Sequence, residues 1–367
     1  MLQLRFLTRW ALVLAAGLWT APASAQDSQQ CFTTNLLGGT TQVCADVYEN
    51  PSSHTKPNAS TILALHGFTE TADTWGPLKD AIFAHPKLGS RVERIIALDL
   101  PGRESSPAPV GLPGGLFQDL IIENYAGVII QVIDGLAQAG LGVDVVLGHS
   151  MGGLEIQSVQ EQLLAQGSSL AQHGVSKAVL LAAVPNSAIV DYAPLVVSSD
   201  LSPVFTPALG LFFQLDPATA QGLGFLKASS LASFPFLEIV CYDGVVNPTP
   251  CTGTVPPNFV GLEPFRVTLQ LVGGEAPPPF PAGYVPPRPF ARQGAFHPSK
   301  GTFLGVIGLT QDVLTPVNFQ LPLYQYLVGT PSSARYREVD TDDAVHSMHI
   351  VSPETLLDEL DQVWQLF

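Results

Sequence analysis

Short, continuous apolar runs recur along the chain and predict its strands. They lie at residues 61–65, 94–98, 143–147, 177–183, 303–309 and 336–339. Runs without polar alternation are typical of parallel strands that helices cover on both faces. The pattern therefore predicts a doubly wound, mostly parallel sheet.

Helical patterns separate these runs, at residues 74–84, 117–139, 154–166 and 317–328. A last helix is predicted from Ser352 as N-cap and Pro353 at the first helical position, followed by an apolar stripe. Alternating strands and helices imply right-handed crossovers, with function at the carboxyl ends of the strands.

The alternation stops after residue 185 and resumes near residue 301. The interval is rich in proline and apolar residues, and it is too long to be a structureless connection. We interpret 186–300 as a cap inserted between two parts of one core, 26–185 and 301–367, with helix at about 206–232. A possible strand at 265–272 leaves the boundary open.

Several phenylalanines of this interval exceed what a small cap can bury in a core of its own. They are Phe205, Phe212, Phe213, Phe225 and Phe234. They indicate an apolar pocket between cap and sheet, for a substrate with a hydrophobic part. The alternative, that they only fix the cap to the core, has equal weight.

The first 25 residues have the features of a secretory signal peptide. Arg5 and Arg9 precede an apolar run at 10–19, and Ala23-Ser24-Ala25 fits the small-residue cleavage rule. The run is half the ~20 residues that a spanning helix needs. We predict cleavage after Ala25, a secreted or periplasmic mature chain, and no stable membrane anchor.

An oxidising compartment lets disulfides persist, so the four cysteines are predicted to pair locally. Cys31 and Cys44 flank Gly38-Gly39, the turn of a predicted N-terminal hairpin, and Cys241 and Cys251 flank a proline-containing loop. Because the cysteines lack C-x-x-C spacing, they do not suggest a zinc site.

The chain carries a formal net charge of −15, and its first 25 residues hold two arginines and no acid, so the mature surface is more acidic still. Such a field repels polyanions, and no dense cluster of basic residues is found. We therefore exclude nucleic acid as a partner.

The most informative motif is Gly148-His149-Ser150-Met151-Gly152, a G-x-S-x-G pattern between a predicted strand and a predicted helix. In this context a serine sits on a sharp turn with its hydroxyl exposed. Glycines at 148, 152 and 153 relieve contacts that a Cβ would make there. Ser150 is therefore a candidate nucleophile.

A serine nucleophile needs a histidine as base and an acid to orient that histidine. Asp312 follows the run at 303–309 and His346 follows the run at 336–339, so both lie at the strand edge that Ser150 shares. His349 competes as base. Rival acids are Glu275, Asp191, Asp342 and Asp343, whereas His66 and His149 are expected to be packed, structural histidines.

These residues resemble those of the α/β-hydrolase-fold serine hydrolases of the esterase and lipase type. The matching segments are His66-Gly67-Phe68, Asp99-Leu100-Pro101-Gly102, the Ser150 motif with Gly153, Asp312 with Thr315-Pro316, and His346-Ser347-Met348-His349 with Pro353. By this resemblance Ser150 is the nucleophile, Asp312 the acid and His346 the general base. Val345 stands where the family usually has glycine.

The resemblance also implies an oxyanion hole made by the backbone N–H groups of Met151 and Phe68, with Thr69 as the alternative to Phe68. It implies cleavage of carboxylic esters, small or polymeric, with no metal or organic cofactor. Ser150 disfavours the dehalogenase and epoxide-hydrolase branches, which have aspartate there. Carbon–carbon bond hydrolases or lyases with the same triad, and a non-catalytic binder of apolar ligands, remain the alternatives.

Overall fold

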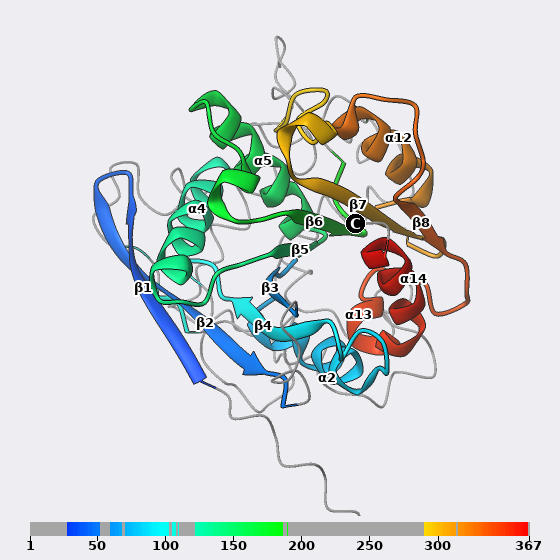
Figure 1. The fold of residues 1–367 in the computed structure, drawn as a ribbon, viewed down its shortest axis with the longest axis horizontal. Helices are drawn as coiled ribbons and strands as arrows, with labels where there is room; N and C mark the ends of the chain where they lie inside the picture. The colour runs from blue at the N-terminus through cyan, green and yellow to red at the C-terminus, as the bar shows by residue number, and fades with distance from the viewer. Residues whose placement is uncertain are drawn as a thin grey trace, which may run out of the picture.

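The computed structural model describes residues 28–51, 59–67, 70–102, 105–107, 109, 122–185, 189, 290–312 and 315–365. In this part of the chain eight strands form one sheet in the order β1-β2-β4-β3-β5-β6-β7-β8 (Figure 1). The strands are β1 Ser28–Leu36, β2 Gly39–Glu49, β3 Ser60–Leu65, β4 Val92–Leu98, β5 Val145–His149, β6 Lys177–Leu181, β7 Phe303–Leu309 and β8 Tyr336–Val339.

β1 and β2 run antiparallel to each other, and β2 runs antiparallel to β4. Every pair from β4 through β3, β5, β6 and β7 to β8 is parallel. The prediction of a doubly wound, mostly parallel sheet with an N-terminal hairpin is confirmed. The carboxyl ends of β5, β7 and β8 therefore share one edge.

Helices cover both faces of the sheet. α4 Ile122–Gln138, α5 Met151–Ala165 and α12 Val317–Val328 pack on one face, and α2 Gly76–Ala84, α13 Met348–Val351 and α14 Pro353–Gln365 pack on the other (Figure 1). The short 3-10 helices are η1 Ala72–Trp75, η2 Leu170–His173 and η5 Pro298–Lys300.

The central strands send alternate side chains into two separate cores. In β3, Leu63 and Leu65 join the core under α4 and α5, whereas Ile62 and Ala64 join the core under α2 and α14. All four are fully buried. This is why these strands are continuously apolar in sequence, since neither face of the sheet meets water.

Some boundaries differ from the sequence prediction for local reasons. β6 ends at Leu181 rather than at residue 183, because Ala182 takes a φ of 45° and leaves the extended conformation. β5 starts at Val145, since the Asp144 carboxylate instead accepts the backbone N–H of Thr61 at 2.8 Å. α13 is absent from the sequence prediction, because a four-residue helix carries too little periodicity to be read from sequence.

The N-terminal hairpin contains the predicted disulfide between Cys31 and Cys44, which face each other in the β1–β2 register. The turn is made by Leu37 and Gly38, with φ values of 52° and 89°, and Gly39 already belongs to β2. A disulfide is compatible with an extracellular or periplasmic location. The predicted Cys241–Cys251 pair lies outside the described residues.

Residues 290–297, predicted to belong to the 186–300 cap, pack on the core. Ala295 and Phe296 are buried, the Ala295 carbonyl accepts from Gln160 Nε2 at 2.8 Å, and Phe296 N donates to the Leu327 carbonyl at 2.8 Å. This segment therefore makes hydrogen bonds to both α5 and α12. The predicted signal peptide and the predicted cap helix and strand at 206–232 and 265–272 lie outside the described residues.

Within the described ranges, no helix has both the length and the apolar character needed to cross a bilayer.

Candidate active site

Ser150 forms the whole turn between β5, which ends at His149, and α5, which begins at Met151. Its φ of 51° and ψ of −114° lie outside the regions that L-residues favour, a conformation that costs about 1–3 kcal/mol. Ser150 N donates to the Leu181 carbonyl at 3.0 Å, and Val184 N donates to the Ser150 carbonyl at 3.1 Å. Bonds to β6 and the segment after it therefore hold the strained residue in place.

The glycines around Ser150 allow the backbones to approach each other. A Cβ on Gly148 would stand 2.5 Å from the carbonyl group of Gly152. A Cβ on Gly152 would collide with the Leu65 carbonyl oxygen, and one on Gly153 with the Cβ of Ala183. The turn expected from the G-x-S-x-G pattern thus requires glycine at each of these positions.

Asp312 and His346 are hydrogen-bonded to each other, with 2.8 Å between His346 Nδ1 and Asp312 Oδ2. Both residues are buried. Thr315 also holds the carboxylate, since its backbone N–H donates to Oδ1 at 2.9 Å and its hydroxyl donates to Oδ2 at 2.5 Å. The loops after β7 and β8, predicted to converge, bring an acid and a histidine into contact.

The surroundings of Asp312 favour its ionised form. Burial alone would raise the pKa of the carboxyl group, but the neighbouring His346 and the two groups of Thr315 hold it below its ordinary value. An ionised Asp312 accepts a hydrogen bond from His346 Nδ1–H, and this leaves Nε2 as the basic nitrogen.

His149, the residue directly before Ser150 in the chain, contacts His346 of this pair. His149 Nε2 is 2.9 Å from the His346 carbonyl oxygen, and the two ring centroids are 4.7 Å apart. Ser150 itself is 6% exposed. The three residues predicted to act together therefore share the carboxyl edge of β5, β7 and β8.

The rival residues have other surroundings or lie outside the described ranges. His349 is fully buried, with its ring centroid 5.0 Å from that of Trp75 and 4.1 Å from that of His149. Asp343 accepts from the Ser352 hydroxyl at 3.1 Å, and Asp342 is exposed. Glu275 and Asp191 are not among the described residues.

Of the two predicted oxyanion donors, Met151 belongs to the described residues and Phe68 does not. Met151 is the first residue of α5, where backbone N–H groups have no acceptor within the helix, and it is buried directly after Ser150. Phe68 and its alternative Thr69 lie outside the described residues, although Gly67 immediately before them belongs to the loop that follows β3.

Sequence reasoning missed Glu70, a buried acid in the loop after β3. Its Oε2 accepts the Gly67 N–H at 2.6 Å and lies 3.0 Å from His149 Nδ1. The signal available was an acid three residues after a His-Gly pair at the carboxyl end of a strand. Nothing in the sequence linked it to His149, 79 residues away.

Glu70, His149 and His349 are the described residues closest to a metal-ligand arrangement, with ligand atoms within 4.8 Å of one another. A metal would need a lone pair on His149. Both ring nitrogens of His149 instead face oxygen acceptors at hydrogen-bond distance, which requires protons on the nitrogens. The arrangement fits an ion pair better than a metal site.

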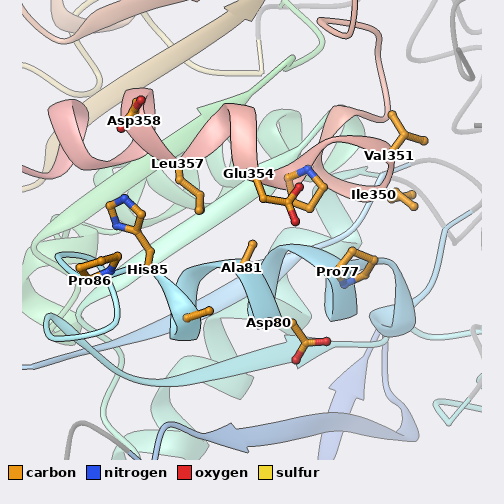
Figure 2. A pocket seen from close by; sticks show the side chains of 12 residues that line it. Pro77, Asp80, Ala81, His85, Pro86, Ile350, Val351, Glu354, Leu357 and Asp358 are labelled. Carbon is orange, nitrogen blue, oxygen red and sulfur yellow. The ribbon is translucent and has the colours of Figure 1, made fainter. Parts of the chain in front are cut away.

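A separate groove of about 860 Å³ lies between α2 and the α13–α14 segment. Figure 2 shows Glu354 and Leu357 of α14 opposite Ala81 of α2 and His85, the residue that follows α2. The groove contains none of the residues predicted to be catalytic. We therefore do not assign it to the candidate active site.

A known protein family matches the part of the chain that carries the candidate site. Residues 62–359 match a family described as the alpha/beta hydrolase family. The matched range contains the Ser150 turn and both members of the Asp312–His346 pair. No curated protein matches the chain.

Solved structures with similar folds include several hydrolases. An N-acyl homoserine lactonase, AidH, complexed with N-butanoyl homoserine, has 14% identity and a TM-score of 0.53, with 92% of this chain and 96% of that chain covered. A structure reported among novel epoxide hydrolases from metagenomes of hot environments has 18% identity and a TM-score of 0.53, with 91% and 98% covered.

A third similar structure is a probable hydrolytic enzyme from Pseudomonas aeruginosa PAO1. It has 16% identity and a TM-score of 0.53, with 94% of this chain and 96% of that chain covered. At such low identities these three likenesses concern the fold.

Proposed function

The chain belongs to the alpha/beta hydrolase family, and on that basis we propose that it is a secreted serine hydrolase that cleaves carboxylic esters through an acyl-enzyme on Ser150. The observation that carries the proposal is a strained serine turn at the same sheet edge as a buried, hydrogen-bonded Asp312–His346 pair. A serine hydroxyl becomes a useful nucleophile only beside such a base.

In the proposed reaction the Ser150 oxygen attacks the ester carbonyl carbon while its proton passes to His346 Nε2. Asp312 accepts the hydrogen bond from the Nδ1–H of His346 and stabilises the imidazolium that forms, while remaining ionised itself. His346 then donates its proton to the leaving alcohol. A water molecule, deprotonated by the same histidine, releases the acid and restores Ser150.

The negative oxygen of the tetrahedral intermediate needs donors that are already in place. We assign this role to the Met151 N–H at the start of α5 and to a second N–H from the loop after β3, at Phe68 or Thr69. The α5 N-terminus adds a favourable field for negative charge. This chemistry uses groups of the chain and water.

A fluorophosphonate probe tests the nucleophile directly, because it forms a covalent bond only with an activated serine. We expect the wild-type chain to be labelled, and Ser150→Ala to fold normally without label. The matched control is Ser158→Ala, which removes another buried serine, from α5, and should leave labelling intact. Labelling that survives in Ser150→Ala would refute the assignment.

Substrate range is tested with p-nitrophenyl esters of graded acyl length and with N-hexanoyl homoserine lactone, a cyclic ester. Activity should rise with an apolar acyl group if the phenylalanines of the predicted cap line the pocket. A labelled chain that cleaves no ester would favour carbon–carbon bond hydrolysis or lyase chemistry. A folded chain that is neither labelled nor active would favour a binder of apolar ligands.

Export is a separate part of the proposal. The Cys31–Cys44 disulfide supports it, since such bonds persist in oxidising compartments. Expression of the full chain in a bacterial host, followed by N-terminal sequencing of the periplasmic or extracellular product, should give a mature chain that begins at Gln26. Recovery of uncleaved chain from the cytosol alone would count against export.

A further inference from the structure

We infer that Glu70 and His149 form a buried ion pair whose role is to position His346 and the loop after β3 around Ser150. Both are positioning residues in this scheme, since neither is assigned a contact with substrate. The positioning role rests on the proposed function, but the charge state of the pair does not.

The protonation state of His149 follows from its two hydrogen bonds. Nε2 lies 2.9 Å from the His346 carbonyl oxygen, which can only accept, so Nε2 carries a proton. Nδ1 lies 3.0 Å from Glu70 Oε2. That oxygen also accepts the Gly67 N–H at 2.6 Å, a short distance typical of an ionised acceptor. Nδ1 is therefore protonated too, and His149 is an imidazolium.

The groups around the pair agree with this assignment. Burial acts against both charges, yet each partner outweighs it, so the pKa of His149 is raised and that of Glu70 is lowered. Asp312, on the loop after β7, also favours the charged His149. Among the residues that the structure describes, the other titratable groups that face it are His346 and His349, from the loop after β8 and from α13.

His349 supplies an independent observation. It is fully buried, and among the described residues neither of its ring nitrogens has a hydrogen-bond partner. Its Nε2 is 3.9 Å from Glu70 Oε2, which is too long for a hydrogen bond. Burial and the charge on His149 keep the pKa of His349 well below its ordinary value. Of these two histidines, His149 therefore carries the charge that balances Glu70.

The pair joins three loops that the chain separates widely. Glu70 holds the backbone of Gly67, next to the predicted oxyanion donor, and His149 is the last residue of β5, directly before Ser150. His149 holds the backbone of His346, whose ring Asp312 orients. Loss of the charge on Glu70 or His149 would weaken the hydrogen bonds that connect the loop after β3, the residue before Ser150 and the backbone of His346.

Two measurements test the inference. The first is the ¹⁵N spectrum of histidine-labelled protein at about pH 8, where an ordinary histidine is almost entirely neutral. We expect one histidine with both ring nitrogens protonated, absent from His149→Gln and converted to a neutral tautomer in Glu70→Gln. The wild-type spectrum needs no variant to fold. A wild-type chain without a doubly protonated histidine would overturn the ion pair.

The second measurement is the rate of fluorophosphonate reaction, together with kcat and KM on a cleaved ester. Because misplacement of catalytic groups by about 1 Å can cost 10²-fold, we expect Glu70→Gln to react about 10- to 100-fold more slowly, through kcat rather than KM. The matched control is Asp134→Asn, which breaks the part-exposed Asp134–His173 pair and should leave the rate unchanged.

The outcomes separate the two proposals. A Glu70→Gln chain that loses the imidazolium but reacts at the wild-type rate overturns the positioning role. A wild-type chain that shows the imidazolium but never reacts with the probe overturns the proposed function, while the ion pair stands. If zinc added at stoichiometric concentration abolished the signal of the doubly protonated histidine, Glu70 and His149 would be assigned to a metal site instead of an ion pair.

Discussion

Asp312→Asn is the substitution that tests the candidate site most sharply. The new side chain has the same shape, and its Oδ1 can keep the bond from Thr315 N, which is 2.9 Å long. The amide nitrogen then replaces Oδ2, 2.8 Å from His346 Nδ1. An amide N–H donates, so Nδ1 must accept, and the proton of His346 moves to Nε2. The nitrogen that should deprotonate Ser150 is then blocked.

The size of the effect can be estimated in two ways. Unit charges 2.8 Å apart at an effective dielectric constant of about 20 attract by about 6 kcal/mol, and the variant loses this stabilisation of the imidazolium. In the serine-protease triad the same change lowers kcat about 10⁴-fold, equivalent to about 5.5 kcal/mol. We therefore expect a loss of about 10⁴-fold in kcat with little change in KM.

The assay is ester hydrolysis by purified wild type, Asp312→Asn and the control Asp340→Asn. Asp340 is an exposed carboxylate just after β8 that accepts from the Thr310 hydroxyl, so its replacement should leave kcat near the wild-type value. Circular dichroism verifies that each variant folds. If Asp312→Asn retained a tenth or more of the wild-type kcat, Asp312 would not be the acid that orients the base.

The same variant should alter the pH dependence of stability. The pKa of Asp312 is lowered in the folded chain, so its ionisation stabilises the fold above the unfolded pKa of about 3.8, and this contribution is lost as pH falls through the lower, folded pKa. The difference in unfolding free energy between wild type and Asp312→Asn should hold steady near neutrality and narrow below about pH 4. Urea denaturation across this range measures it, and a difference independent of pH would contradict the assignment.

Two further predictions concern the backbone around the site and the hairpin. Gly152→Ala should abolish activity and lower the free energy of unfolding by more than about 2 kcal/mol, because its Cβ would collide with the Leu65 carbonyl oxygen. The control is Gly76→Ala, where a Cβ meets nothing within 4 Å and which should be neutral or slightly stabilising. Thermal denaturation compares the two variants with the wild type. Replacing Cys31 and Cys44 together by serine should lower the free energy of unfolding by at most about 3 kcal/mol with kcat unchanged, since the bond closes a loop of 13 residues far from Ser150 in sequence; a large loss of kcat would tie the hairpin to the site.

Local patterns were sufficient for the strands from β3 to β8, for most helices and for the Ser150 turn. Continuous apolar runs arise where a strand is buried on both faces. Glycine is needed at 148, 152 and 153 because a Cβ at any of these positions would collide with a neighbouring segment. Both signals reside in neighbouring residues. The placement of Ser150, Asp312 and His346 at one edge then followed from the parallel sheet, whose strands have their carboxyl ends on the same side.

Tertiary structure alone decided which side chains pair at that edge. Asp312 rather than Asp342 or Asp343 meets His346, and Glu70 meets His149, because these contacts join loops from different strands. It also placed residues 290–297 on the core, although the alternation of strands and helices resumes only after them in the sequence. Hydrogen-bond partners and charge states depend on distances between segments far apart in the chain, and these distances exist only after folding.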